Sequence, residues 1–458
     1  MSAGEEEAAG LFGGLPEQAA PRREVSGSPR LRTPERRQVE LRAVSLEELL
    51  PAEHRARFVW AFAGRLDLSA LYGAIKSVEG RPGHPAADPR LLLALWLYAT
   101  VEGVGSAREL DRLCCEHVGF QWLCGGVSLN HVTLAEFRVA HAAVLERLLI
   151  DGFAAMLQTG QAALERVAQD GMRVRASAGA ASFRRLGSLA RCREAAAARL
   201  AELHAELEAD PGAMSRRQAA QRERAARQRQ LRVEEAVAVL DKLGQGKGKP
   251  PRDQAPSAAG GDGGGPAKKK PAAPRASTSD AEARVMKMAD GGFRPAFNVG
   301  FATDTRSGMV AAVAVDNRGS DMGKLATMSD QLAIAYGRRP AAHLVDGGFV
   351  VLADIERLAG EGVAVFAPPP TPRAAARDRH APLPDDSPGV AAWRVRMGGD
   401  AAKAIYKERA ATSEWVNGQC RNRGLLRFLV RGVRNAHAVA LLHALAHNMM
   451  CSWRLAAA

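Results

Sequence analysis

Three acidic residues stand in settings that suit metal-dependent chemistry on phosphates. Asp170 and Asp346 each follow an apolar stretch and precede a glycine, while Glu414 lies in a later, basic segment with a helical pattern. Divalent cations such as Mg²⁺ prefer carboxylate oxygens, and two of them about 4 Å apart stabilise both the attacking and the leaving oxygen of a phosphodiester. The three residues therefore predict a site for two Mg²⁺ ions, with Mn²⁺ as a substitute.

The chain is strongly basic. Its 458 residues include 63 Lys and Arg against 50 Asp and Glu, for a formal net charge of +13. This balance favours a polyanionic partner, because neutralised phosphates release counterions. No apolar run reaches the roughly 18–20 residues of a membrane span, and the acidic first residues do not form a secretion signal. We expect a cytoplasmic, nucleoid-associated protein that binds double-stranded DNA and no membrane.

The N-terminal part is predicted to be helical. Residues 1–38 lack periodicity, which is typical of a disordered tail, and residues 39–158 are predicted to form a helical DNA-binding domain. Capping-box patterns predict helix starts at Ser106 and Thr133, each with a glutamate three residues later. A bundle that only packs or dimerises is the alternative. The arginines expected on exposed helix faces are Arg108, Arg112 and Arg138.

A cysteine-rich stretch lies within these helices. Cys114, Cys115 and Cys124 are close to His117 in the sequence. They lack the paired C-x₂-C spacing of structural zinc sites, so we favour free buried thiols over a zinc site.

The three acidic residues belong to a domain that an insertion divides. Residues 159–189 contain a strand predicted to end at Asp170, and residues 286–458 resume with a hairpin followed by alternating helices and strands. This order predicts an α/β fold with a mixed sheet flanked by helices.

The insertion itself has two parts. Residues 190–243 predict an antiparallel helical hairpin, broken at Pro211 because proline cannot continue a helix. Residues 244–285 are rich in Gly, Pro, Ala and Lys, which predicts a flexible basic linker.

Several segments resemble the DDE transposases of bacterial insertion sequences, over roughly residues 40–455. The resemblance lies in DPRLLLALWLYATVEGVGSARELDRLCCEHVGFQWLCGG, in MKMADGGFRPAFNVGFATD, in VDNRGSD and in HLVDGGF. The most similar branch has a helical N-terminal domain and a coiled-coil insertion after the first catalytic strand. The resemblance implies an RNase H-like catalytic fold, in which Asp170, Asp346 and Glu414 form the metal-binding triad.

A C-terminal motif adds to this resemblance. Tyr406-x₂-Arg409, followed by Glu414 and then Arg421, is similar to the tyrosine–arginine–glutamate–basic signature of these enzymes. Four residues lie between Arg409 and Glu414, where the commonest form of the signature has three. The resemblance implies that Tyr406 and Arg409 position phosphates and that Arg421 contacts the terminal DNA.

A run of arginines follows Glu414. Their helical spacing predicts that most of the guanidiniums share one face and track phosphates, although a solvated face is the alternative. The five residues are Arg421, Arg423, Arg427, Arg431 and Arg434.

Other residues surround the predicted site. Helix capping is the preferred role for Asp316 and Asp321. Glycines beside the catalytic aspartates are expected to let a nucleic-acid backbone approach. The further acids within reach are Asp304, Asp316, Asp321 and Glu408, and the glycines are Gly171, Gly347 and Gly348.

The resemblance implies a DNA transposase. Such an enzyme cleaves at terminal inverted repeats, and the freed 3′-hydroxyl attacks target DNA by transesterification. Pairing of two ends implies a homodimer or a larger synaptic complex, with residues 190–243 as a candidate interface. Two alternatives stay open: a nuclease of the same fold that does not join strands, and a domesticated DNA-binding protein.

Overall fold

The computed structural model describes residues 37, 43, 45–80, 84–210, 215–245, 273–372 and 378–457. No helix in these ranges is long and apolar enough to cross a membrane. The predicted tail, apart from residue 37, lies outside the described residues, as do Pro211 and the middle of the predicted linker, 246–272.

The first folded part of the chain consists of helices. They are η1 (Leu46–Leu49), α1 (Arg55–Ala63), α2 (Ser69–Gly73), α3 (Pro89–Val101), α4 (Ala107–Glu116), α5 (Val118–Cys124), α6 (His131–Ala140) and α7 (Ala142–Gln158). Helix α3 is buried almost all round because nearly every residue from Leu91 to Ala99 is apolar. Trp96 on α3 donates its indole N–H to the carbonyl of Leu134 on α6 at 2.9 Å. This bond joins the centre of α3 to its neighbour.

One predicted helix start is confirmed and the other is wrong. The hydroxyl of Ser106 accepts from the amide of Glu109 at 3.4 Å and caps α4. Helix α6, however, begins before Thr133, because the Asn130 side chain accepts from two first-turn amides at 3.0 Å each. Asparagine is at least as good a cap as threonine, so the earlier residue starts the helix.

The prediction that Arg138 is exposed is also wrong. Its side chain lies over the Trp96 ring, with Cζ 4.8 Å from the ring centroid, and donates to the carbonyl of Gly105. Burial lowers the pKa of Arg138 to about 10. Arg108 and Arg112 are exposed, but two glutamates of α4 already pair with Arg112.

The second half is built on the mixed sheet that the sequence predicted. Its strands are β1 (Arg166–Arg175), β4 (Arg284–Lys287), β5 (Phe293–Asp304), β6 (Val310–Asp316), β7 (Ala342–Leu344) and β8 (Ala364–Phe366). The order is β4-β5-β1-β7-β8, with β6 also paired to β5. Strand β5 is antiparallel to β1, β4 and β6, whereas β7 is parallel to both β1 and β8. The chain is therefore a mixed α/β protein.

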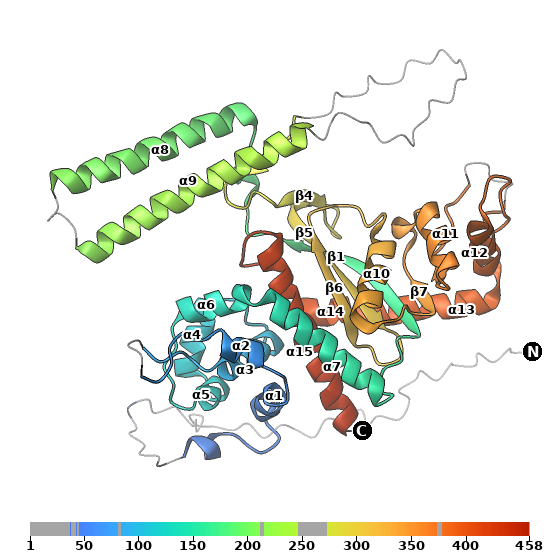
Figure 1. Cartoon of the computed structure of the whole chain (residues 1–458), viewed down its shortest axis with the longest axis horizontal. Coiled ribbons are helices and arrows are strands. Elements are labelled where there is room, and N and C mark those ends of the chain that lie inside the picture. Colours follow the sequence, from blue (N-terminus) through green and yellow to red (C-terminus); the bar gives the residue numbers. More distant parts are fainter. Residues whose placement is uncertain are drawn as a thin grey trace, which may run out of the picture. The chain divides into compact units, whose positions relative to one another are not determined.

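Helices and short turns complete this half (Figure 1). They are η2 (Ala180–Ser182), α10 (Lys324–Tyr336), η4 (Gly347–Phe349), α11 (Leu352–Gly360), α12 (Pro388–Gly398), α13 (Asp400–Arg409), η5 (Ala410–Glu414), α14 (Trp415–Asn422) and α15 (Val433–Ala457). Between β1 and β5 the chain forms two long helices that pack against each other, α8 (Leu186–Ala209) and α9 (Arg216–Gln245).

The predicted linker is wrong at its C-terminal end. Strand β3 (Ala276–Ser277) pairs with β2 (Phe183–Arg184), and β4 already begins at Arg284. Ala276 and Ala281 are buried against Leu189 of α8 and Leu240 of α9. A composition of small and polar residues hides this packing, because the partners come from distant parts of the chain.

Helix α15 joins the N-terminal helices to the sheet. It contacts α3, α6 and α7 and also β5 and β6 (Figure 1). Asn448 on α15 accepts from the amide of Val310 and donates to its carbonyl, both at 2.8 Å. A single hydrophobic core therefore extends from the helices to the sheet.

A buried histidine in β7 makes stability depend on pH. His343 is fully buried, and neither ring nitrogen has a partner among the described residues. Burial lowers its pKa to about 3. The unfolded chain therefore binds a proton here below about pH 6.5, which the folded protein does not, so stability is lost as pH falls from 6.5 toward 3.

We expect His343→Leu to reduce the dependence of the free energy of unfolding on pH in this range by about 1.4 kcal/mol per pH unit. Thermal melts in steps from about pH 6.5 to 4.5 measure the slope. His84→Leu is the matched control, because His84 is exposed and should leave the slope unchanged. Equal slopes for His343→Leu and the wild type would contradict the assignment.

Candidate active site

Asp170 on β1 and Asp346, which follows β7, lie at matching positions relative to the pairing of these two parallel strands. Strands β1 and β7 are paired up to Ala168 and Leu344, and Asp170 and Asp346 each follow two residues later. Alternation of side chains directs them to the same face, on strands that lie about 4.8 Å apart. The charge of Asp346 accordingly contributes to raising the pKa of Asp170, after the larger effect of burial. Pairing of two distant strands thus brings the two carboxylates together.

Asp170 does not end its strand, contrary to the prediction. Strand β1 continues to Arg175 because it stays paired with β5 along its whole length. Only the pairing with β7 stops at Ala168, so one edge of β1 is open at Asp170. Asp346 does follow its strand, as predicted, and its Oδ1 accepts from the amide of Gly348 at 2.7 Å.

Residues of the C-terminal helices hold the Asp170 carboxylate. Asn417 Nδ2 on α14 donates to Asp170 Oδ2 at 3.1 Å. Arg409 Nη1, at the end of α13, lies 3.9 Å from Asp170 Oδ1 and opposes the rise in pKa that burial causes. The Asp170 side chain is 22% exposed, so its charge is poorly solvated, and the Arg409 guanidinium and the Gly171 amide, which donates to Asp170 Oδ1 at 2.9 Å, offset part of this cost.

Tyr406 completes this group. The Arg409 Cζ atom lies 5.7 Å from the centre of the Tyr406 ring. Burial raises the pKa of Tyr406, and the charges of Asp346 and Asp170 raise it further, which places the phenol near both carboxylates. The structure therefore gathers four of the predicted site residues and adds Asn417, which the sequence analysis missed. Its position three residues after Glu414 on a helix is the signal that could have revealed it.

Glu414 is not gathered with the two aspartates. Its side chain is exposed and forms no hydrogen bond or ion pair with any described residue. In the described ranges, no group of three His, Cys, Asp or Glu side chains is placed to hold a metal ion, and this includes the cysteine-rich stretch. All six cysteines are free thiols.

The helix that carries Glu414 contains a π-helical turn, η5, at Ala410–Glu414. A π-helix repeats after five residues, where an α-helix repeats after about four. Arg409 and Glu414 therefore have the relation that residues i and i+4 have in an α-helix. The turn absorbs the extra residue between them.

The predicted helical face of arginines is wrong. Helix α14 ends at Asn422 and α15 begins only at Val433. Gly424 and Gly432 have positive φ angles of 88° and 81°, which α-helices exclude. The intervening segment instead pairs with the end of β1, where the Phe428 amide donates to the Arg175 carbonyl at 2.8 Å. Burial lowers the pKa of Arg423, and the exposed members are Arg421, Arg427, Arg431 and Arg434.

The other candidate acids have protein partners. Asp321 is buried and does not cap a helix as predicted, because Arg173 pairs with it at 2.8 Å and Lys324 at 3.3 Å. Asp316 caps a turn at Arg318 and also pairs with Lys324, at 2.8 Å. Asp304 accepts from Leu164 and Ser307, and Glu408 pairs with Arg166.

Gly171 is required by packing inside the protein. A Cβ atom there would lie 2.5 Å from Asp321 Oδ1 and 3.0 Å from Asn298 Oδ1. At Gly348 an added Cβ would meet Asp346 Oδ1 at 3.0 Å, and at Gly347 it would meet only Pro368, at 3.5 Å. Close contact with buried polar side chains therefore requires glycine at this position, and the role of Gly171 in DNA approach stays a prediction.

Comparison with known proteins identifies one part of the chain. The family described as Transposase domain (DUF772) matches residues 44–140, which contain helices α1 to α6. The match supports a transposase-family protein with a function related to transposition. It does not extend to the sheet or to the aspartates. No curated protein and no solved structure matches the chain.

We expect Gly171→Ala to lower the free energy of unfolding by about 1–3 kcal/mol, because the added methyl group displaces buried polar atoms. Gly152→Ala in α7 is the control, since nothing lies within 4 Å of an added Cβ there. It should stabilise the protein by about 0.5–1 kcal/mol through helix propensity. Urea unfolding measures both, and wild-type stability of Gly171→Ala would refute the packing role.

Proposed function

We propose that the chain is a DDE transposase, which cleaves DNA at the ends of a mobile element and joins those ends to target DNA. One observation carries the proposal: Asp170 and Asp346 each follow by two residues the last paired residues of the parallel strands β1 and β7, and the charge of Asp346 contributes to the raised pKa of Asp170. The match of residues 44–140 to a transposase domain supports it independently. The order of strands and helices also matches the order from which the sequence predicted a mixed sheet flanked by helices.

The two aspartates suit a divalent cation. Asp346 forms no ion pair with the described residues, and Asp170 has only Arg409, at 3.9 Å. Two carboxylates with so little compensating charge form a donor set that Mg²⁺ prefers. A bound Mg²⁺ would lower the energy of the negative charge that develops on the reacting phosphate.

Glu414 is the third ligand in this proposal. Arg409 and Asn417, on either side of it along the helix, both reach Asp170. The π-turn and the helical spacing support a position of Glu414 on the same side of the helix, and its carboxylate has no partner among the described residues. A rotamer change of an exposed glutamate costs little, so the side chain can turn toward a metal held by the two aspartates.

Residues around the carboxylates have separate roles. Arg409 and Tyr406 position the phosphate of the scissile bond, because a guanidinium and a phenol both donate to phosphate oxygens. Asn417 holds the Asp170 carboxylate in place through its hydrogen bond. The net charge of +13 favours double-stranded DNA as the partner, in a homodimer or a larger synaptic complex.

Cleavage of a plasmid that carries the gene with its flanking DNA tests the proposal. We expect Asp170→Asn and Asp346→Asn each to slow Mg²⁺-dependent cleavage by about 10³-fold, because a metal site supplies several kcal/mol and 1.36 kcal/mol is a factor of ten. Unchanged cleavage by either variant would refute the assignment.

Glu414→Gln tests the third ligand, with Glu408→Gln as its matched control. Glu408 pairs with Arg166 and should change the rate by less than about twofold. If Glu414→Gln cleaves as fast as this control, the third ligand is another residue.

The products of the assay separate the alternative functions. DNA in which the element ends are joined to target DNA indicates a transposase, and cleavage without joining indicates a nuclease of the same fold. A biological effect that survives Asp170→Asn would favour the domesticated DNA-binding protein.

A further inference from the structure

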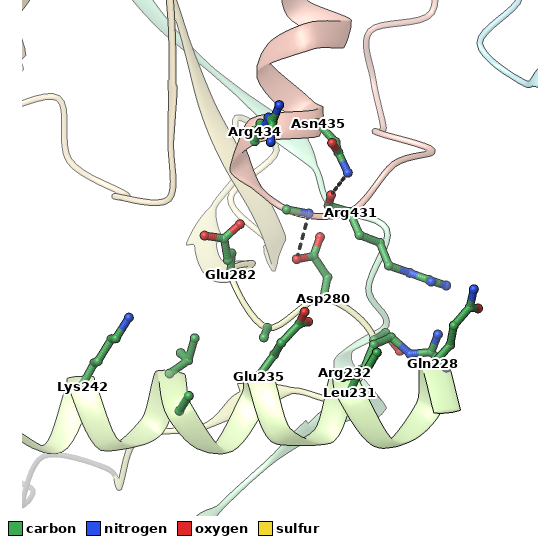
Figure 2. A pocket seen from close by; sticks show the side chains of 15 residues that line it. Gln228, Leu231, Arg232, Glu235, Lys242, Asp280, Glu282, Arg431, Arg434 and Asn435 are labelled. Carbon is green, nitrogen blue, oxygen red and sulfur yellow. Dashed lines mark hydrogen bonds between the residues drawn. The ribbon is translucent and has the colours of Figure 1, made fainter. Parts of the chain in front are cut away.

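A groove lined by free cations lies between α9 and the start of α15. It has a volume of about 690 Å³, and its walls come from α9, from residues 279–282 and from residues 431–435 (Figure 2). Four cations line it: Arg232, Lys242, Arg431 and Arg434. None of the four forms an ion pair with any described residue. Elsewhere on the hairpin, acidic neighbours pair with arginines, as Glu202 and Glu206 do with Arg199.

Two acids of the groove are engaged by the backbone of α15. Asp280 accepts from the amide of Gly432 at 3.2 Å, and Glu282 accepts from the amide of Val433 at 2.8 Å. The positive end of the helix dipole offsets both carboxylates. Burial also raises the pKa of Asp280. Glu235 points toward Asp280, at the middle of the groove (Figure 2).

One end of the groove holds two arginines. Arg431 extends toward the part of α9 that carries Arg232 and Gln228 (Figure 2). The pKa of Arg232 is lowered, first by burial and then by the charge of Arg431. Two guanidiniums from distant parts of the chain thus face each other, and neither forms an ion pair with a described residue.

We propose that this end of the groove binds a backbone phosphate of duplex DNA, held by Arg232 and Arg431 with Gln228 as a further donor. The forked N–H groups of arginine match two phosphate oxygens at once, and a shared phosphate removes the repulsion between the two cations. The insertion then contributes directly to DNA binding. The inference rests on the proposed function, which makes DNA the polyanion.

The groove lies within reach of the active site along one duplex. Asp170 and Arg175 are separated by five residues of β1, about 17 Å at 3.3 Å per residue. Phe428 is hydrogen-bonded to Arg175, and Arg431 follows three residues later. The groove is therefore within roughly 30 Å of Asp170, or about nine base-pair steps of 3.4 Å.

Salt-dependent binding of the full-length chain tests the inference. Fluorescence anisotropy with a duplex of about 30 base pairs, in EDTA and from about 50 to 200 mM NaCl, gives the slope of log affinity against log salt. We expect Arg232→Gln/Arg431→Gln to reduce the slope by about 0.9, the value for one lost phosphate contact. Affinity should also fall by about tenfold or more.

Two matched variants separate the groove from general charge. Arg217→Gln/Arg224→Gln removes the same charge from exposed positions of α9 outside the groove and should keep the wild-type slope. Arg232→Lys/Arg431→Lys should also keep the slope but lose affinity, because lysine retains charge without the fork. Circular dichroism and a thermal melt verify that each variant is folded.

An unchanged slope for Arg232→Gln/Arg431→Gln, or an equal loss in the control pair, would overturn the inference. So would displacement of the duplex by polyglutamate at equal charge concentration, since the groove would then bind carboxylates. The assay contains no Mg²⁺ and does not depend on cleavage. A wild-type chain that binds with the expected slope but never cleaves would count against the proposed function alone.

Discussion

Burial of α15 is the constraint on which both halves of this protein depend. Residues 440–449 of α15 are all buried, so this part of the helix must be covered on every side. The residues of α15 with the least exposure are small or apolar, and they include Ala436, Ala440, Leu441, Ala444 and Met449. The N-terminal helices cover one side and strands β5 and β6 cover another. The helical part and the sheet therefore stabilise each other through one shared element.

The same helix fixes the position of the candidate catalytic side chains. Trp415, the residue after Glu414, stacks edge to face on His447 of α15 at 4.9 Å. Its ring also fills the space beside Gly308, where an added Cβ would lie 2.8 Å away. The helix that carries Arg409 and Asn417 is thereby anchored to α15 and to the β5–β6 turn. Packing of the Trp415 ring therefore helps to set the geometry around Asp170.

Structural features that depend on neighbouring residues in the sequence could be predicted. Features that depend on partners from distant parts of the chain could not. The apolar run before Asp346 marks the end of a strand correctly, because a strand and its turn are neighbours in the chain. The run before Asp170 does not, since pairing with β5 prolongs β1. The sequence around Arg138 gives no indication that its side chain packs on the Trp96 ring. For Arg423 to Arg434, charge spacing suggested a helix, whereas two glycines with positive φ interrupt it.

The insertion between β1 and β5 also affects how the chain folds during its synthesis. Asp170 pairs with Phe301, about 130 residues later in the chain. At about 5–20 residues per second, synthesis leaves β1 without its neighbour for roughly 6–25 s. Its residues Val167, Ala168, Met172 and Val174 are all buried in the finished sheet. During that interval they form an unpaired apolar strand, while the local α8–α9 hairpin has ample time to fold. The nascent chain is therefore most prone to aggregation before its candidate active site is assembled.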